Sequence, residues 1–222
     1  VIANRDIENL GKEKGVSQFC SPKDPINLAQ STNDAYPTSL KMALLTMNVE
    51  LVEKLKKIVE AFREKGKELT PVIKMGRTQL QDAVPMSMGQ EFEAFAATLE
   101  EDISKLNANA NLFVEVNMGA TAIGTGLNAP VGYANLCAKN LAQLTGFNVI
   151  SAPNLVDATP DTGSYVIYSS ALKRLAVKLS KICNDLRLLS SGPRAGFFEI
   201  NLPPMQPGSS IMPGKVNPVI PE

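Results

Sequence analysis

The sequence of 222 residues contains no histidine, the side chain that most often serves as a general base or a metal ligand. Any proton transfer must therefore use another group. Cysteine is scarce as well: its three copies lie far apart and show no CxxC spacing, which predicts reduced thiols in a cytoplasmic protein. They are Cys20, Cys137 and Cys183.

The sequence also has no excess of positive or of negative charge. Lys and Arg number 22 and Asp and Glu number 22, so the formal net charge is zero. A neutral chain without a basic face gives no electrostatic reason to expect nucleic acid or an anionic membrane as a partner. No apolar run approaches the roughly 20 residues of a membrane-spanning helix. The opening "VIANRDIENL" does not have the form of a signal peptide.

What the sequence has in abundance is helical periodicity. In three long segments the apolar residues recur at steps of three and four, with Glu and Lys between them, which is the period of an α-helix. These segments exceed the average helix of about 11 residues, so they favour an elongated bundle with coiled-coil-like packing. They cover residues 38–69, 88–113 and 172–189.

Proline residues mark where the first two of these helices are expected to begin, the first behind Pro37 and the second behind Pro85. Shorter helices are predicted near residues 2–14 and 131–145, and we find no convincing alternating strand pattern. The predicted fold class is therefore all-α. The long helices are richly apolar, which implies partner helices from another subunit or from sequence outside the chain.

The segment "QSTNDAYP" precedes the first long helix and has two interpretations. Short hydroxyl and amide side chains form turns and cap helices by bonding nearby backbone groups. Alternatively, Ser31, Thr32 and Asn33 form a nest of donors for a carboxylate, because a helix N-terminus favours anions.

The segment "GATAIGTGLNAP" suggests nucleotide binding but lacks its signatures. In a phosphate-binding loop Gly126 would be followed by Lys and Ser or Thr, whereas Leu127 and Asn128 follow it here. A dinucleotide loop needs a preceding strand, whereas a long helix is predicted before this segment. We interpret it as a glycine-permitted turn that ends the second long helix, with Asn128 able to face a site.

The segment "GRTQLQDAVP" offers two neutral donors, Thr78 and Gln79, which could hold a carboxylate or an amine without supplying a base. A lone charged residue in such a segment forms a loop salt bridge more often than it catalyses, and we expect this of Arg77 or Asp82.

The closing segment, residues 207–222, reads "PGSSIMPGKVNPVIPE". Its glycines give backbone freedom and its prolines restrict it, so the segment is both hinged and shaped. It is either a surface turn or a loop that carries an activated serine, whose alkoxide an ammonium group and backbone N–H groups would stabilise. The polar residues concerned are Ser209, Ser210, Lys215 and Asn217.

Taken together, these segments resemble the fumarase/aspartase superfamily, whose members eliminate an amine or a hydroxyl group to release fumarate. "QSTNDAYPT", "GRTQLQDAVPMSMGQEF", "GATAIGTGLN" and "GSSIMPGKVNP" occur in the order of that family, and the resemblance covers residues 1–222. It implies that residues 1–222 are the central helical domain of a chain roughly twice as long. The N-terminal domain and the rest of the bundle would then lie outside this sequence.

Gln79 indicates the branch of the superfamily. Fumarases carry "THLQDA" with a histidine implicated in activating water, whereas this sequence has "TQLQDA", similar to members that eliminate ammonia from L-aspartate to give fumarate. The resemblance therefore implies a carbon–nitrogen lyase. The alternatives are a fumarase-like lyase acting on malate or another succinyl substrate, and a non-catalytic helical oligomerisation fragment.

The resemblance also implies roles for individual residues. Ser209 would remove the Cβ proton, and Lys215 would help stabilise the dianionic intermediate. It implies no metal and no organic cofactor, and a homotetramer whose active sites are shared between subunits. Glu222 corresponds to a glutamate that pairs with the histidine in fumarases; with Gln79 in place of that histidine, the pairing is changed and the role of Glu222 is left open. The implied substrate-binding residues are Ser31, Thr32, Asn33, Thr78, Gln79, Ser210 and Asn217.

Overall fold

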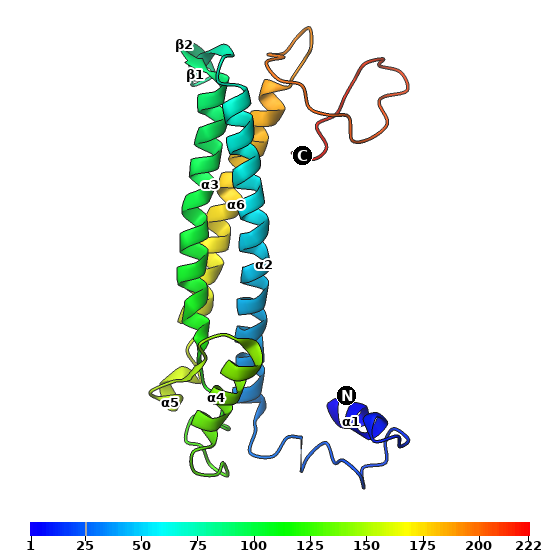
Figure 1. The fold of residues 1–222 in the computed structure, drawn as a ribbon, viewed down its shortest axis with the longest axis vertical. Coiled ribbons are helices and arrows are strands. Elements are labelled where there is room, and N and C mark those ends of the chain that lie inside the picture. The colour runs from blue at the N-terminus through cyan, green and yellow to red at the C-terminus, as the bar shows by residue number, and fades with distance from the viewer. Residues whose placement is uncertain (25) are drawn as a thin grey trace. The chain divides into compact units, whose positions relative to one another are not determined.

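The computed structural model describes residues 1–24 and 26–222, and most of them are helical. Three long helices dominate it, as the all-α prediction requires (Figure 1). The longest has 37 residues, which at 1.5 Å per residue makes it roughly 55 Å long. The long helices are α2 (Thr32–Glu68), α3 (Met88–Ala110) and α6 (Gly163–Leu189).

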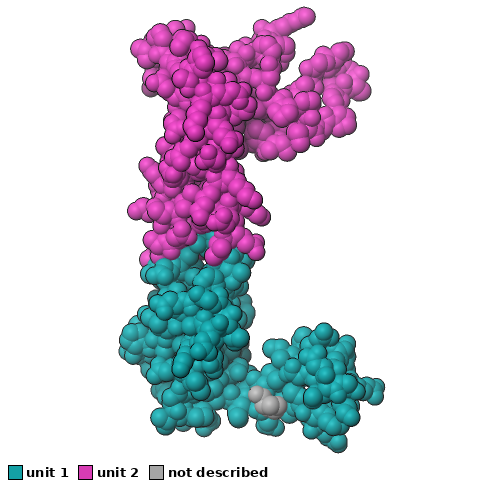
Figure 2. Space-filling model, in the orientation of Figure 1, with its two compact units in different colours: residues 1–48, 109–165 teal, residues 49–108, 166–222 magenta. Residues whose placement is uncertain are grey.

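The chain divides into two compact units, coloured separately in Figure 2. Unit 1 comprises residues 1–48 and 109–165, and unit 2 comprises residues 49–108 and 166–222. Each unit has buried apolar residues of its own.

Unit 1 holds the start of α2 and a set of short elements. A small core forms around Val116, Met118, Ala138 and Val149, and Met42 and Leu141 pack against it. Strands β3 and β4 form a parallel pair. The short elements are α1 (Ile2–Asn9), the 3₁₀ helix η1 (Asn111–Val114), β3 (Glu115–Val116), α4 (Tyr133–Thr145), β4 (Ile150–Ser151) and α5 (Leu155–Ala158).

Unit 2 packs stretches of the three long helices along one another. Phe62 of α2 meets Phe92 and Phe95 of α3 edge-on, with ring centroids 6.0 and 5.6 Å apart. Between α3 and α6 the fully buried Asp102 forms ion pairs with Arg174 at 3.0 Å and Lys178 at 2.8 Å. A buried charge that lacked such partners would be costly, so these pairs favour one register of α6 against α3.

A β-hairpin in unit 2 corrects the expectation of no strands. Strands β1 (Ile73–Thr78) and β2 (Gln81–Ser87) pair antiparallel. The register shifts between Met75 and Arg77, because Ala83 and Val84 of β2 together lie opposite Gly76 of β1; this bulge breaks the alternation by which strands are recognised. The two residues of the turn, at 79 and 80, both have left-handed backbone, with φ of 51° and 63°. Such turns normally carry Asn-Gly rather than Gln-Leu.

The start of α2 is a second correction, because the helix begins at Thr32 and includes Pro37. Proline lacks the N–H that would bond the carbonyl of Asn33 one turn earlier. The side-chain amide of Asn117 donates to that carbonyl instead, at 3.0 Å. A contact from a distant loop therefore lets the helix continue through a proline.

The remaining boundaries agree with the predicted elements in order and type. Helix α3 starts within the predicted segment, although residues 85–87 belong to β2. Helix α6 starts at Gly163 rather than at Leu172. The two shorter helices predicted are α1 and α4, at residues 2–9 and 133–145.

Candidate active site

The predicted site residues occur in three places, one in unit 1 and two in unit 2. The first place is the start of α2, the second is the turn of the hairpin, and the third is the closing segment.

At the start of α2 the structure confirms the capping interpretation. The Ser31 hydroxyl accepts from the backbone N–H of Asn33 at 3.2 Å, and Asp34 Oδ1 accepts from the backbone N–H of Ser31 at 2.8 Å. This reciprocal arrangement is a capping box with Asp in the third helical position. Thr32 and Asn33 are exposed and Ser31 is half-buried, so polar groups of all three remain near the surface.

Asp34 is the residue of this group that the sequence analysis missed. It is fully buried, and its Oδ2 accepts from the backbone N–H groups of Gly119 at 3.2 Å and Thr121 at 2.9 Å. The side chain of Asn33 adds a bond to the carbonyl of Ala122 at 2.7 Å. Asp34 thus ties the candidate residues to the glycine-rich segment. Its position three residues after Ser31 is the sequence signal that could have identified it.

The glycine-rich segment has the left-handed backbone that its sequence predicts. Gly119, Gly124 and Gly126 have φ of 91°, 98° and 68°. A Cβ on Gly124 would lie 2.3 Å from the Cα of Val156, so only glycine fits there. The segment does not end α3 directly, because η1 and β3 intervene. Asn128 is exposed.

At the turn of the hairpin, Thr78 and Gln79 are exposed. The left-handed backbone at Gln79 is costly for a residue other than glycine, and such strain is concentrated at functional sites. Gln79 lines a pocket of about 350 Å³ together with Lys74, Arg77 and Phe197. The turn therefore presents a neutral amide beside charged groups.

The closing segment places backbone donors on its first serine. The Ser209 hydroxyl oxygen accepts from the N–H groups of Ile211 at 3.4 Å and Met212 at 3.2 Å. A Cβ on Gly208 would lie 3.3 Å from the carbonyl oxygen of Lys215, so the backbone closes on itself between these residues.

The exposure of the other predicted residues varies along this segment. Ser209 and Asn217 are half-buried, while Ser210 and Lys215 are exposed. The carboxylate of Glu222 lies 3.9 Å from Arg187, and both side chains are largely exposed.

A second pocket, of about 270 Å³, borders the same segment. Gly214, Val216 and Pro218 contribute to its wall, as does Phe198. Ser190, directly after α6, lines it as well. The two arms of the loop that carries Ser209 therefore enclose a hollow against the end of α6.

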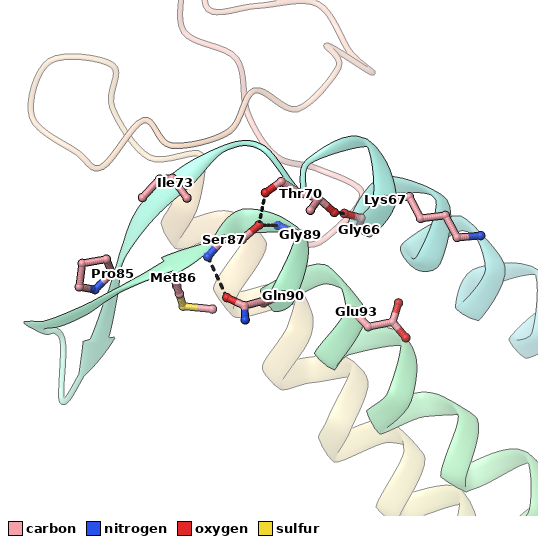
Figure 3. A pocket seen from close by; sticks show the side chains of 10 residues that line it. All are labelled: Gly66, Lys67, Thr70, Ile73, Pro85, Met86, Ser87, Gly89, Gln90 and Glu93. Atoms are coloured by element: carbon pink, nitrogen blue, oxygen red, sulfur yellow. Dashed lines mark hydrogen bonds between the residues drawn. The ribbon is translucent and has the colours of Figure 1, made fainter.

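A third pocket, of about 640 Å³, contains none of the predicted residues (Figure 3). It lies where the hairpin meets α3, and Ser87 is the lining residue that forms several hydrogen bonds there. Its hydroxyl donates to the carbonyl of Thr70 at 2.7 Å and accepts from Gly89 at 3.1 Å, and its own N–H donates to Gln90 at 2.9 Å. This is a second capping box, at the start of α3.

Unit 2 also contains a network of ion pairs that was not predicted from the sequence. Glu199 bonds Arg77 and forms an ion pair with Lys74 at 2.9 Å, and Lys74 also pairs with Glu91. The Arg77 guanidinium lies 4.0 Å from the centre of the Phe197 ring. A salt bridge was the expected role of Arg77 and is confirmed, but Arg77 lies in β1 rather than in a loop, and its partner Glu199 is far away in the sequence.

The ion pairs of this network favour the ionised form of the Glu199 carboxyl. Burial raises the pKa of the Glu199 carboxyl, but hydrogen bonds from Arg77 and Lys74 outweigh it and hold the pKa below its ordinary value of 4.5. The bond to Glu199 raises the pKa of Arg77. Glu199 is therefore an anion at neutral pH.

Among residues 1–24 and 26–222, no group of three His, Cys, Asp or Glu side chains is arranged to hold a metal ion. In the same part of the chain, no helix combines the length and the apolar character that crossing a membrane requires. The cysteines Cys20, Cys137 and Cys183 are free thiols.

Comparison with known proteins identifies the family of the chain. The sequence model of the lyase family matches residues 1–222, and the chain belongs to this family. It is 56% identical to the aspartate ammonia-lyase of Escherichia coli (strain K12), over all of this chain and 46% of that protein. It is 58% identical to the aspartate ammonia-lyase of Helicobacter pylori (strain ATCC 700392 / 26695), over all of this chain and 47% of that protein. The chain thus spans about half the length of the curated relatives it matches.

Solved structures give the same result for the fold. The fumarate lyase:delta crystallin from Brucella melitensis bound to cobalt has a TM-score of 0.94 and 57% identity, covering 100% of this chain and 48% of that one. The class II fumarase from Schistosoma mansoni has a TM-score of 0.87 and 32% identity, covering 99% of this chain and 49% of that one. The fold is therefore shared by relatives described as lyases and as a fumarase.

Proposed function

We propose that the full-length protein eliminates ammonia from L-aspartate to give fumarate. The observation that carries this proposal is the identity of 56–58% to aspartate ammonia-lyases along the whole chain. It is supported by Gln79 in the position where fumarases have a histidine, in a chain without any histidine. The 32% identity to a class II fumarase is lower, which favours aspartate over malate.

Ser209 is proposed as the general base that removes the Cβ proton. A serine acts as a base only when its deprotonated oxygen is stabilised. The N–H groups of Ile211 and Met212, which both donate to the Ser209 oxygen, supply such stabilisation.

Loss of the Cβ proton places charge on the β-carboxylate, and this dianionic intermediate requires several donors and a cation. We assign Lys215, Ser210, Ser31, Thr32 and Thr78 to that carboxylate. Asn33, Gln79 and Asn217 would orient the α-carboxylate and the amine. Ammonia then leaves as the Cα–N bond breaks, and fumarate forms. The sequence of steps is proton abstraction and elimination, for which we propose no metal and no organic cofactor.

We further propose that residues 1–222 are the central helical domain of a cytoplasmic homotetramer whose active sites are shared between subunits. Exposed apolar side chains on the long helices support partner helices, with Met47 and Val49 on α2 and Val166 and Val177 on α6 between 50% and 64% exposed. The 222-residue chain alone should then have little or no activity.

The test is the substitution Ser209→Ala in the full-length protein, with Ser104→Ala as the matched control. Ser104 is an exposed serine on α3 whose hydroxyl donates only to the helix backbone. We expect Ser209→Ala to reduce fumarate formation from aspartate by about 100-fold or more, as loss of a positioned base does, with assembly intact. The control should keep full activity. Undiminished turnover by Ser209→Ala would contradict the assignment of the base, and faster turnover of malate than of aspartate would contradict the substrate.

A further inference from the structure

Two cations of β1 reach the same carboxylate beside the bulge of the hairpin. In a regular strand, residues an odd number of positions apart point to opposite faces, so Lys74 and Arg77 would point away from each other. Both nevertheless pair with Glu199, at the place where the register shifts because β2 has an extra residue opposite Gly76. Gly76 is itself buried, and a Cβ there would lie 3.0 Å from the carbonyl oxygen of Val84. The hairpin is thus shaped to present two cations together.

The carboxylate that receives them belongs to Glu199, at the start of the loop that leads to Ser209. The backbone around Glu199 is bonded to the end of α6: the N–H of Glu199 donates to Leu189 at 2.9 Å, and the N–H of Phe198 donates to Ser191 at 2.9 Å. The Glu199 side chain is 16% exposed and that of Lys74 is 7% exposed. This start of the loop is therefore fixed on two sides, by the end of α6 and by the hairpin.

In the pocket that Gln79 lines, beside this contact, each positively charged side chain is paired with a negatively charged one. Its cations are Lys74, Arg77 and Lys181, and each is paired with a carboxylate; Lys181 pairs with Asp185. The pocket therefore has no surplus positive charge with which to bind an anionic ligand. The geometry favours a role in positioning the two segments rather than in binding.

We propose that Glu199 is a positioning residue, which holds the start of the loop carrying Ser209 in register with the hairpin that carries Thr78 and Gln79. Arg77 precedes Thr78 directly, so the ion pair reaches the turn through a single peptide unit. This inference rests on the proposed function for its effect on catalysis. Its structural part, a loop fixed by the pairs of Glu199, can be tested independently.

The experiment compares Glu199→Gln, Glu199→Asp and Glu53→Gln in the full-length protein. Glu53 forms an exposed ion pair with Lys56 in the same unit, so Glu53→Gln makes the same chemical change where positioning is not involved. The measurements are kcat and KM for L-aspartate, and hydrogen exchange of the backbone N–H groups at residues 198–200. The melting temperature is recorded for each variant.

We expect Glu199→Gln to lower kcat by about 10-fold to 100-fold, the range caused by misplacement of a catalytic group by about 1 Å. KM should change less, and exchange at residues 198–200 should become faster. Glu199→Asp, which keeps the charge, should recover part of both effects, and Glu53→Gln should match the unsubstituted protein.

A Glu199→Gln variant that melts earlier but keeps kcat and the exchange rates would overturn the inference. If Glu199→Gln does not fold, the same comparison is made with Glu199→Asp, and unchanged kcat and exchange there would also overturn it. Absence of fumarate formation by the unsubstituted protein would instead contradict the proposed function. The hydrogen-exchange result would then decide the positioning role alone.

Discussion

Two carboxylates, the fully buried Asp34 in unit 1 and the half-buried Glu199 in unit 2, join a candidate site segment to its surroundings by different means. Asp34 in unit 1 is held by backbone N–H groups from Ser31, Gly119 and Thr121. Glu199 in unit 2 is held by the side chains of Arg77 and Lys74. Backbone donors have fixed positions and cannot be exchanged by substitution, whereas side-chain donors depend on charge and on rotamer. The first connection is therefore rigid, and the second can be altered one charge at a time.

The largest effect is expected from Asp34→Ala. It leaves the N–H groups of Gly119 and Thr121 buried without an acceptor, and each such donor costs about 1–3 kcal/mol. We expect the free energy of unfolding to fall by about 4 kcal/mol, measured by urea denaturation. Asp34→Asn keeps one acceptor oxygen and should lose about half as much. Equal losses for the two variants would show that packing, rather than acceptance by the carboxylate, is what matters at this position.

A medium effect is expected from Gly76→Ala, which tests how the hairpin presents its two cations. The added Cβ would lie 3.0 Å from the Val84 carbonyl and 3.1 Å from the Met86 sulfur. Overpacking of this kind costs about 1–3 kcal/mol, and the shift should also separate Lys74 or Arg77 from Glu199. The measurement is a double-mutant cycle on stability with Glu199→Gln. If the two losses simply add, the bulge is not what aligns the cations.

The smallest effect is expected from acid. The pKa of Glu199 is lower in the folded protein than its ordinary value of 4.5, so its contribution is fully present above that value. It is lost as the pH falls below 4.5 and through the lower pKa of the folded state, because the unfolded chain binds the proton first. The stability of the unsubstituted protein should therefore approach that of Glu199→Gln as the pH is lowered. A constant difference between them across this range would exclude a charged Glu199 as the source.

The sequence predicted those parts of the fold that depend on local pattern. Steps of three and four apolar residues identified the long helices, because burial of one helix face is recorded in the sequence itself. The start of α2 was misplaced because it depends on Asn117, whose amide replaces the hydrogen bond that Pro37 lacks. The hairpin was missed because the bulge of β2 opposite Gly76 interrupts its alternation and because Gln79–Leu80 carries none of the usual turn residues. Both errors arise where a distant contact or a strained backbone overrides local preference.

The candidate site shows the same division. Ser31 and Asn33 could be recognised as capping residues because both partners are close in the sequence. The spacing from Ser31 could have identified Asp34 as a capping residue, but not its connection to Thr121. The connection of Glu199 to Arg77 could not be recognised either, because in both cases the partner lies far along the chain. Roles in catalysis remain predictions for all of the site residues.

The proline within α2 also has a consequence for the order in which the protein folds. The first turn of α2 is completed by Asn117 and by the N–H groups of Gly119 and Thr121, which Asp34 binds; all three residues lie more than eighty residues further along the chain. Because such non-local contacts form slowly, the body of α2 beyond Pro37 should become helical early and its first turn late. During synthesis the candidate residues Ser31, Thr32 and Asn33 would then acquire their final geometry only after the glycine-rich segment has been made. The site at this end of α2 therefore reaches its final geometry only when the glycine-rich segment packs against the helix.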